Sequence, residues 1–162
     1  MRTKPFSISI AILLVTGGYL AGRAQSQSNQ PAKNDPPAEQ VTGIGGVFLK
    51  AHDPKKLAAW YRDNLGFPMK GAMAKFLWSE RGKPEQQGQT VWSLFPTNTT
   101  YFGASLSPVM INYRVTNLDR MIEQLRSKGV AVEKTEDSDY GRFTWVTDPE
   151  GNRLELWEPK AK

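Results

Sequence analysis

Cysteine is absent from the 162-residue sequence, and histidine occurs only once, at His52. The absence of cysteine excludes disulfide bonds, a thiol nucleophile, a thiolate metal site and the lipid attachment of a lipoprotein. A single histidine also supplies only one imidazole ligand, which is too few for a metal centre built on imidazoles. Because the sequence positions no serine or cysteine nucleophile with His52, a catalytic triad has no support.

Neither sign of charge dominates: 21 Lys and Arg residues stand against 16 Asp and Glu residues, a net charge of +5. Arg2, Lys4 and Arg23 lie in the first 24 residues, and without that segment 18 basic and 16 acidic residues remain. The remaining charges are mixed along the chain and form no basic patch of the kind that nucleic-acid-binding proteins carry. We therefore predict no nucleic-acid partner.

Long apolar runs are also missing, apart from residues 6–20. This run follows Arg2 and Lys4 and precedes the small residues of Gly22-Arg23-Ala24, a pattern typical of a secretory signal peptide over residues 1–24. The pattern predicts a secreted or periplasmic protein without membrane contact after cleavage. The alternative is an uncleaved membrane anchor, for which the run is short. Residues 25–40 are polar and proline-rich, as in a disordered linker, which leaves one domain over residues 41–160.

The domain contains an internal repeat. Residues 46–53 and 110–117 each alternate as a strand does, and Asp53 and Asn117 then suit the N-cap position of a helix. Two apolar helical faces follow, and Gly66 and Gly129 suit the left-handed position that ends a helix. The faces consist of Leu57, Trp60, Tyr61 and Leu65, and of Leu118, Met121, Ile122 and Leu125. Each half then offers three short strands, at residues 67–70, 74–79 and 90–95, and at 130–134, 142–147 and 153–158. The acidic stretch at residues 136–139 is interpreted as a solvated loop.

The closing segment, residues 148–157, is the most informative motif. Pro149 and Gly151 predict a tight turn, and the strand after it alternates, with Glu155 between Leu154 and Leu156. This turn and strand, together with the repeat, resemble the vicinal oxygen chelate superfamily, which includes glyoxalase I, extradiol dioxygenases and bleomycin-resistance proteins. The resemblance covers roughly residues 43–159. It implies an α+β fold in which two βαβββ modules form curled mixed sheets around a cup, and members often pair as homodimers.

Strand alternation predicts which side chains face the cup. On the first strand these include Phe48 and Lys50, and on the closing strand they are Arg153, Glu155 and Trp157. The remaining candidates for ligand binding are Ser93, Phe95, Met110, Asn112 and Arg114.

In metal-dependent members of the superfamily, the glutamate at the place of Glu155 is a metal ligand. The resemblance puts the other ligands at Gly46, Ser93 and Met110, none of which suits a divalent cation. His52 lies six residues beyond Gly46, about 20 Å along a strand. We therefore predict neither a metal site nor another cofactor, which argues against glyoxalase I and dioxygenase activity.

A carboxylate inside the cup needs a partner. Glu155 either forms an internal ion pair with Arg114, Lys50 or Arg153, or belongs with these groups and the aromatic residues to a ligand pocket. The main functional prediction is a secreted protein that binds a small organic molecule, anionic in view of the basic groups, without a metal. One alternative is a lyase or isomerase with Glu155 as general base, although adjacent arginines are expected to lower its pKa. Another is a dimeric interaction module whose cup its own side chains fill.

Overall fold

The computed structural model describes residues 36–80 and 83–160. The predicted signal peptide, residues 1–24, and most of the predicted linker lie outside this part of the chain. In the described residues, neither of the two helices is long and apolar enough to cross a membrane. Contacts of the domain begin at Pro37, before the boundary at residue 41 that the sequence suggested.

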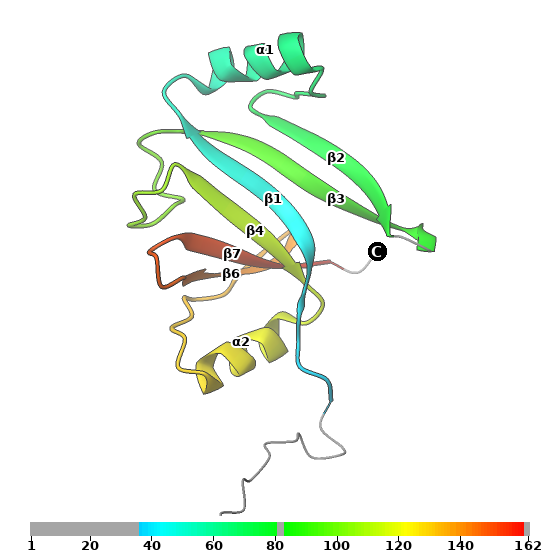
Figure 1. The fold of residues 1–162 in the computed structure, drawn as a ribbon, viewed down its shortest axis with the longest axis vertical. Helices are drawn as coiled ribbons and strands as arrows, with labels where there is room; N and C mark the ends of the chain where they lie inside the picture. The colour runs from blue at the N-terminus through cyan, green and yellow to red at the C-terminus, as the bar shows by residue number, and fades with distance from the viewer. Residues whose placement is uncertain (1–35, 81–82, 161–162) are drawn as a thin grey trace, which may run out of the picture. The chain divides into compact units, whose positions relative to one another are not determined.

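Seven strands form one mixed sheet in the order β2-β3-β1-β4-β7-β6-β5. Figure 1 shows that each half of the chain supplies one side of this sheet. The first half contributes β1 (Val41–Ala51), α1 (Pro54–Leu65), β2 (Met73–Glu80) and β3 (Lys83–Pro96). The second contributes β4 (Val109–Val115), α2 (Leu118–Ser127), β5 (Glu136–Ser138), β6 (Gly141–Thr147) and β7 (Arg153–Pro159).

The two halves share one topology, which confirms the predicted α+β fold of βαβββ-type modules. In each half the first strand pairs in parallel with the last, as β1 does with β3 and β4 with β7. The halves join where β1 and β4 run antiparallel, with Gly46 opposite Asn112. The last strands of both modules therefore lie near the junction, where their inward side chains face one another.

Local sequence signals position the helices as predicted. The Asp53 side chain accepts a hydrogen bond from the Lys56 N–H at the start of α1, and Asn117 accepts one from the Arg120 N–H at the start of α2. Gly66 and Gly129 have φ angles of 66° and 78°, the left-handed conformation in which a side chain would be strained. Gly151 has the same conformation in the predicted turn, at 81°.

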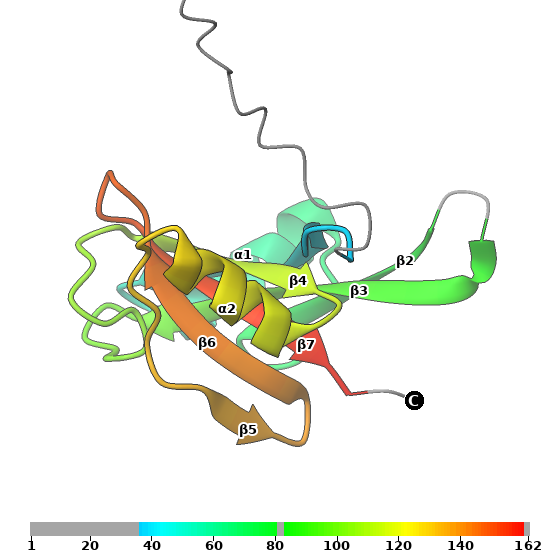
Figure 2. The ribbon, with the colours of Figure 1, turned by 90° about the horizontal axis from the view of Figure 1, so that it is seen from below.

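The second half has the larger apolar core. α2 lies across β6 and β7 in Figure 2 and buries its predicted face against them. This cluster contains Val115, Leu118, Met121, Ile122, Val146 and Leu156. α1 differs from the prediction, because Trp60 and Leu65 are more than half exposed. Ala58 is the buried residue of α1, and Tyr61 packs edge-on against Trp92 of β3.

Two of the six predicted later strands are wrong. Residues 67–70 and 130–134 contribute only isolated bridges, Lys70 to Met73 and Val132 to Val146. Conversely, the acidic stretch expected to be a solvated loop contains β5, which pairs with β6 through Glu136 and Phe143. β5 is the outer edge of the sheet in Figure 2, so its exposed carboxylates remain solvated while its backbone is paired.

Candidate functional site

A hollow of about 360 Å³ lies over the inner face of the sheet, between the two modules. Side chains from β1, β2, β3, β4, β6 and β7 line it, together with Tyr101 from the loop between β3 and β4 and Tyr140 from the turn between β5 and β6. The lining residues are Gly45, Phe48, Met73, Lys75, Gln89, Val91, Ser93, Phe95, Tyr101, Asn112, Tyr140, Phe143, Glu155 and Trp157. Every second residue of a strand points inward, which explains why the contributions of β2, β3 and β7 are spaced two apart.

Glu155 forms the floor of this hollow. Its side chain is 1% exposed, and Asn112 lies directly beside it because β4 and β7 pair in register at these two residues. Asn112 Nδ2 donates to Glu155 Oε1 at 2.5 Å, and the Tyr101 hydroxyl donates to Oε2. Both donors are neutral, so the carboxylate is hydrogen-bonded without being neutralised.

The pKa of Glu155 is raised above its ordinary value, chiefly because burial disfavours the charged carboxylate. The hydrogen bonds from Tyr101 and Asn112 oppose this rise, as does the charge of Arg153. The sequence predicted that Arg153 and Arg114 would lower this pKa, and in the structure burial has the larger and opposite effect. The Tyr101 pKa is raised as well, because its hydroxyl is buried beside the carboxylate.

Two polar atoms of the described residues near this floor are buried without a hydrogen-bond partner, Asn112 Oδ1 and Trp145 Nε1. The Trp145 N–H lies outside hydrogen-bond geometry but close enough to Glu155 to favour the ionised carboxylate. Asn112 Oδ1 lies against Gly45, at a register shift of β1, and a Cβ on Gly45 would be 2.1 Å from this oxygen. Glycine at position 45 thus leaves room for the amide that holds Glu155.

Aromatic rings form most of the walls. Phe95 and Tyr101 are stacked, with ring centres 5.1 Å apart and planes inclined by 6°. Phe48 packs edge-on against both rings. On the opposite side, Phe143 and Trp157 stack at 6.3 Å. The Trp157 indole N–H donates to the Tyr140 carbonyl at 3.0 Å, which fixes the ring. The walls are therefore preformed and largely apolar.

Six of the ten predicted site residues line the hollow: Phe48, Ser93, Phe95, Asn112, Glu155 and Trp157. The other four are Lys50, Met110, Arg114 and Arg153, and they have other contacts. Met110 is buried in a cluster with Phe48, Phe102 and Trp145.

The three basic residues among these four do not line the hollow. Lys50 Nζ donates to the Ser105 carbonyl at 2.9 Å. Arg114 Nε donates to Thr42 Oγ1 at 2.9 Å, and its guanidinium lies over the Trp78 ring. Arg153 Nη2 pairs with Glu133 at 2.6 Å. None of the ion pairs found among residues 36–80 and 83–160 includes Glu155, so the basic groups that suggested an anionic ligand no longer support one.

Sequence reasoning missed Tyr101. This residue lies in an irregular loop, where alternation assigns no face, and only the packing of that loop brings its hydroxyl to Glu155. The hydrogen bond from Arg153 to the Tyr101 carbonyl holds the loop in place. Lys75, Tyr140 and Phe143 were also missed, although Phe143 lies on a predicted strand and alternation was available to place it.

A model of the glyoxalase-like domain family matches residues 46–157, which include both modules and the whole floor of the hollow. The chain belongs to this family. The match agrees with the resemblance to the vicinal oxygen chelate superfamily found in the sequence.

Solved structures with this fold include methylmalonyl-CoA epimerases. A variant of the Streptomyces coelicolor enzyme in complex with 2-nitronate-propionyl-CoA is 20% identical, with a TM-score of 0.57. A methylmalonyl-CoA epimerase in complex with methylmalonyl-CoA and NH4+ is also 20% identical, with a TM-score of 0.56. Each alignment covers 75% of this chain and 97% of the epimerase. A superfamily member from Vibrio splendidus 12B01 is 14% identical over 74% of this chain and 98% of its own, at a TM-score of 0.46. No curated protein matches.

This glyoxalase-like chain lacks suitable side chains at most of the positions that hold the metal ion in metal-dependent members of the superfamily. At the four ligand positions, Gly46 has no side chain, Met110 offers a thioether buried in a core cluster, and Ser93 offers a neutral hydroxyl. Glu155 is the one anionic donor of the four, whereas a divalent cation of this kind needs three or more good ligands. The described residues contain no group of three or more His, Asp or Glu side chains arranged to hold an ion.

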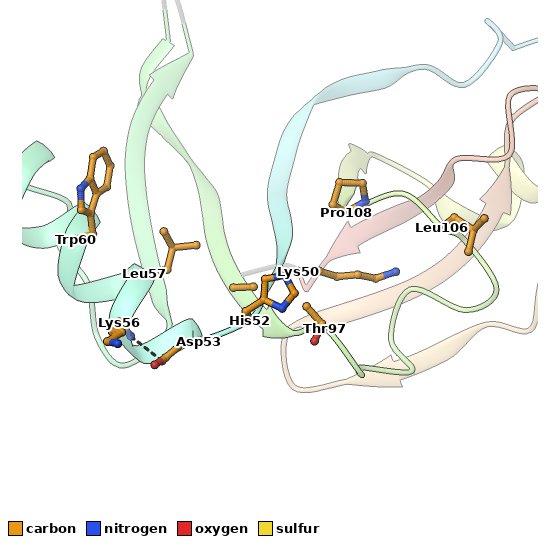
Figure 3. A pocket seen from close by; sticks show the side chains of 10 residues that line it. Lys50, His52, Asp53, Lys56, Leu57, Trp60, Thr97, Leu106 and Pro108 are labelled. Atoms are coloured by element: carbon orange, nitrogen blue, oxygen red, sulfur yellow. Dashed lines mark hydrogen bonds between the residues drawn. The ribbon is translucent and has the colours of Figure 1, made fainter.

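A larger hollow of about 690 Å³ lies at the end of β1 and the start of α1, as Figure 3 shows. Lys50, His52 and Lys56 line it together with the exposed side chains of Trp60 and Leu106. The Asp53 carboxylate in this hollow caps α1 through the Lys56 N–H, a structural role. No buried ionisable group lies among these described residues, so the inner hollow over Glu155 is the better candidate site.

Proposed function

We propose that this glyoxalase-like protein binds a small, largely apolar organic molecule in the inner hollow, without a metal. The observation that carries this proposal is a preformed space of about 360 Å³, walled by aromatic rings, with a buried carboxylate at its floor. Small-molecule sites combine this size and apolar lining with a few polar groups. The predicted export signal adds that the molecule is bound outside the cytoplasm.

Binding without turnover accounts for the floor better than catalysis does. A general base must lie within hydrogen-bond reach of the proton that it removes. Each oxygen of Glu155 already accepts a hydrogen bond, and the side chain is 1% exposed. A substrate would therefore have to reach a carboxylate that is shielded from solvent and already accepts from Tyr101 and Asn112.

A thermal-shift screen of small aromatic and aliphatic molecules tests the proposal, with isothermal titration of the compounds that raise Tm. Ser93 lines the hollow, so Ser93→Phe should fill it and weaken binding at least tenfold. His52→Ala, in the other hollow, is the matched control and should leave the affinity unchanged. The proposal fails if a broad panel gives no binding, or if His52→Ala weakens binding and Ser93→Phe does not.

One observation favours a second function, proton transfer by Glu155. Its raised pKa brings the carboxylate closer to the range in which a base works at neutral pH. Formation of lactoylglutathione from methylglyoxal and glutathione, abolished by Glu155→Gln, would establish a lyase of the glyoxalase kind. The third alternative, a module with a filled cup, is weakened by the open hollow. Dimerisation stays a prediction, which sedimentation equilibrium tests.

A further inference from the structure

The charge of Glu155 indicates the chemical class of the ligand. This carboxylate lies at the floor of the inner hollow with neutral hydrogen-bond donors, Tyr101 and Asn112. The guanidinium of Arg153, whose charge acts on Glu155, is held by Glu133 through two hydrogen bonds of 3.0 and 2.6 Å. When Glu155 is ionised, the floor therefore carries a negative charge that no ion pair within the described part of the chain compensates.

The groups around the carboxylate add to this negative potential. The carbonyl oxygen of Asn112 is buried beside it without a donor. Phe48, Phe95 and Phe143 line the hollow above it, and the face of an aromatic ring attracts a cation. A carboxylate at the floor of a hollow lined by aromatic rings is an arrangement that suits a positively charged organic group.

Lys75 is the one positively charged residue among those that line the hollow. Its side chain is exposed, and its ammonium lies 5.9 Å from the ring centre of Tyr140, which is 69% exposed. Lys75 thus lies at the mouth of the hollow, where solvent screens its charge. A cation at the mouth and an ionised carboxylate at the floor would orient a charged ligand.

We propose that the ligand of the inner hollow is an organic cation, a primary or substituted ammonium on an aromatic or aliphatic body, with its charge toward Glu155. This inference rests on the proposed function. Direct contact with the carboxylate is not required, because the attraction between charges falls only with the first power of distance and is strong where water is excluded. The aromatic rings that line the hollow would contact the body of the ligand, and the carboxylate would favour a positive charge on it.

Three probes of nearly equal size test the proposal: phenethylamine, 2-phenylethanol and phenylacetate. Isothermal titration should show the amine binding at least tenfold more tightly than the alcohol, and phenylacetate binding most weakly. Glu155→Gln should remove the preference for the amine over the alcohol. The variant keeps the packing, because a flip of the Asn112 amide turns the unpartnered Oδ1 toward the new Gln N–H.

Glu123→Gln is the matched control, since it removes the same charge from an exposed position on α2. It should leave all three affinities unchanged. Equal binding of the three probes, or a preference for phenylacetate, would overturn the cation proposal while leaving the proposed function intact. Failure of phenethylamine to bind, with neutral compounds binding in the broad panel, would also overturn it. Failure of every compound would overturn both.

Discussion

At the scale of single residues, the fold keeps one ionisable side chain, Glu155, almost completely out of water. Burial raises its pKa, so the ionised form is less stable in the folded protein than in the unfolded chain. For a carboxyl group with a raised pKa, folding stability is highest below the unfolded value. It falls as the pH rises through the interval between the unfolded and folded pKa values, and it is level above that interval.

Glu155→Gln should therefore raise the free energy of unfolding at pH 7, because Gln cannot ionise. The advantage should shrink when the pH falls below about 4.3, the ordinary value for Glu, since the wild-type carboxyl is then protonated in both states. Urea unfolding at pH 7 and pH 3.5 measures both effects. A loss of about 2 kcal/mol at pH 7 would instead mean that hydrogen bonds to the charged group outweigh its burial.

At the scale of elements, α2 stabilises the second module more than α1 stabilises the first. Leu118 is fully buried at the start of α2, in a cluster with residues of β4, β6 and β7. Leu118→Ala is expected to lower the free energy of unfolding by about 2–5 kcal/mol, because it leaves a cavity in this cluster.

Leu106→Ala is the matched control for that variant, since Leu106 is 98% exposed. Its unfolding free energy should change by no more than about 0.5 kcal/mol. Chemical denaturation of both variants compares them directly. Similar losses for the two leucines would contradict the assignment of the core to α2 and the sheet.

At the scale of the whole molecule, the residues before β1 are attached to the second module. The Glu39 carboxylate accepts hydrogen bonds from the backbone N–H groups of Thr116 and Asn117, both at 3.1 Å, next to the start of α2. Its side chain is only 8% exposed. The chain leading into the first module thus helps to hold the helix of the second.

Glu39→Ala should lower the free energy of unfolding by about 1–2 kcal/mol, because it leaves two backbone donors without their acceptor. Thermal unfolding of the full chain measures this loss. Glu150→Ala, an exposed change of the same kind in the turn before β7, should have almost no effect. An unchanged Tm for Glu39→Ala would show that water replaces these contacts without cost.

Export is the second prediction at this scale. The pattern of residues 1–24 predicts cleavage after Ala24, which would give a mature chain that begins at Gln25. Intact mass and N-terminal sequencing of the exported protein check the cleavage site. Recovery of the chain in the membrane fraction with Met1 or Arg2 at its N-terminus would support the uncleaved anchor instead.

The sequence by itself determined the repeat, the helix starts at Asp53 and Asn117, the turn at Gly151 and the apolar face of α2. These features depend on residues that are close together in the chain, where capping, left-handed glycine and periodicity act. For the same reason, alternation identified Phe48, Asn112, Glu155 and Trp157 as inward-facing.

Only the tertiary structure decided which charged groups meet. Arg153 and Glu155 share a face of β7, yet Arg153 pairs with Glu133 and Glu155 with Tyr101 and Asn112. The partner of a long side chain depends on segments distant in the sequence, and Tyr101 comes from a loop that has no periodicity to place it. Burial, which also arises only when the modules join, then raises the pKa of Glu155.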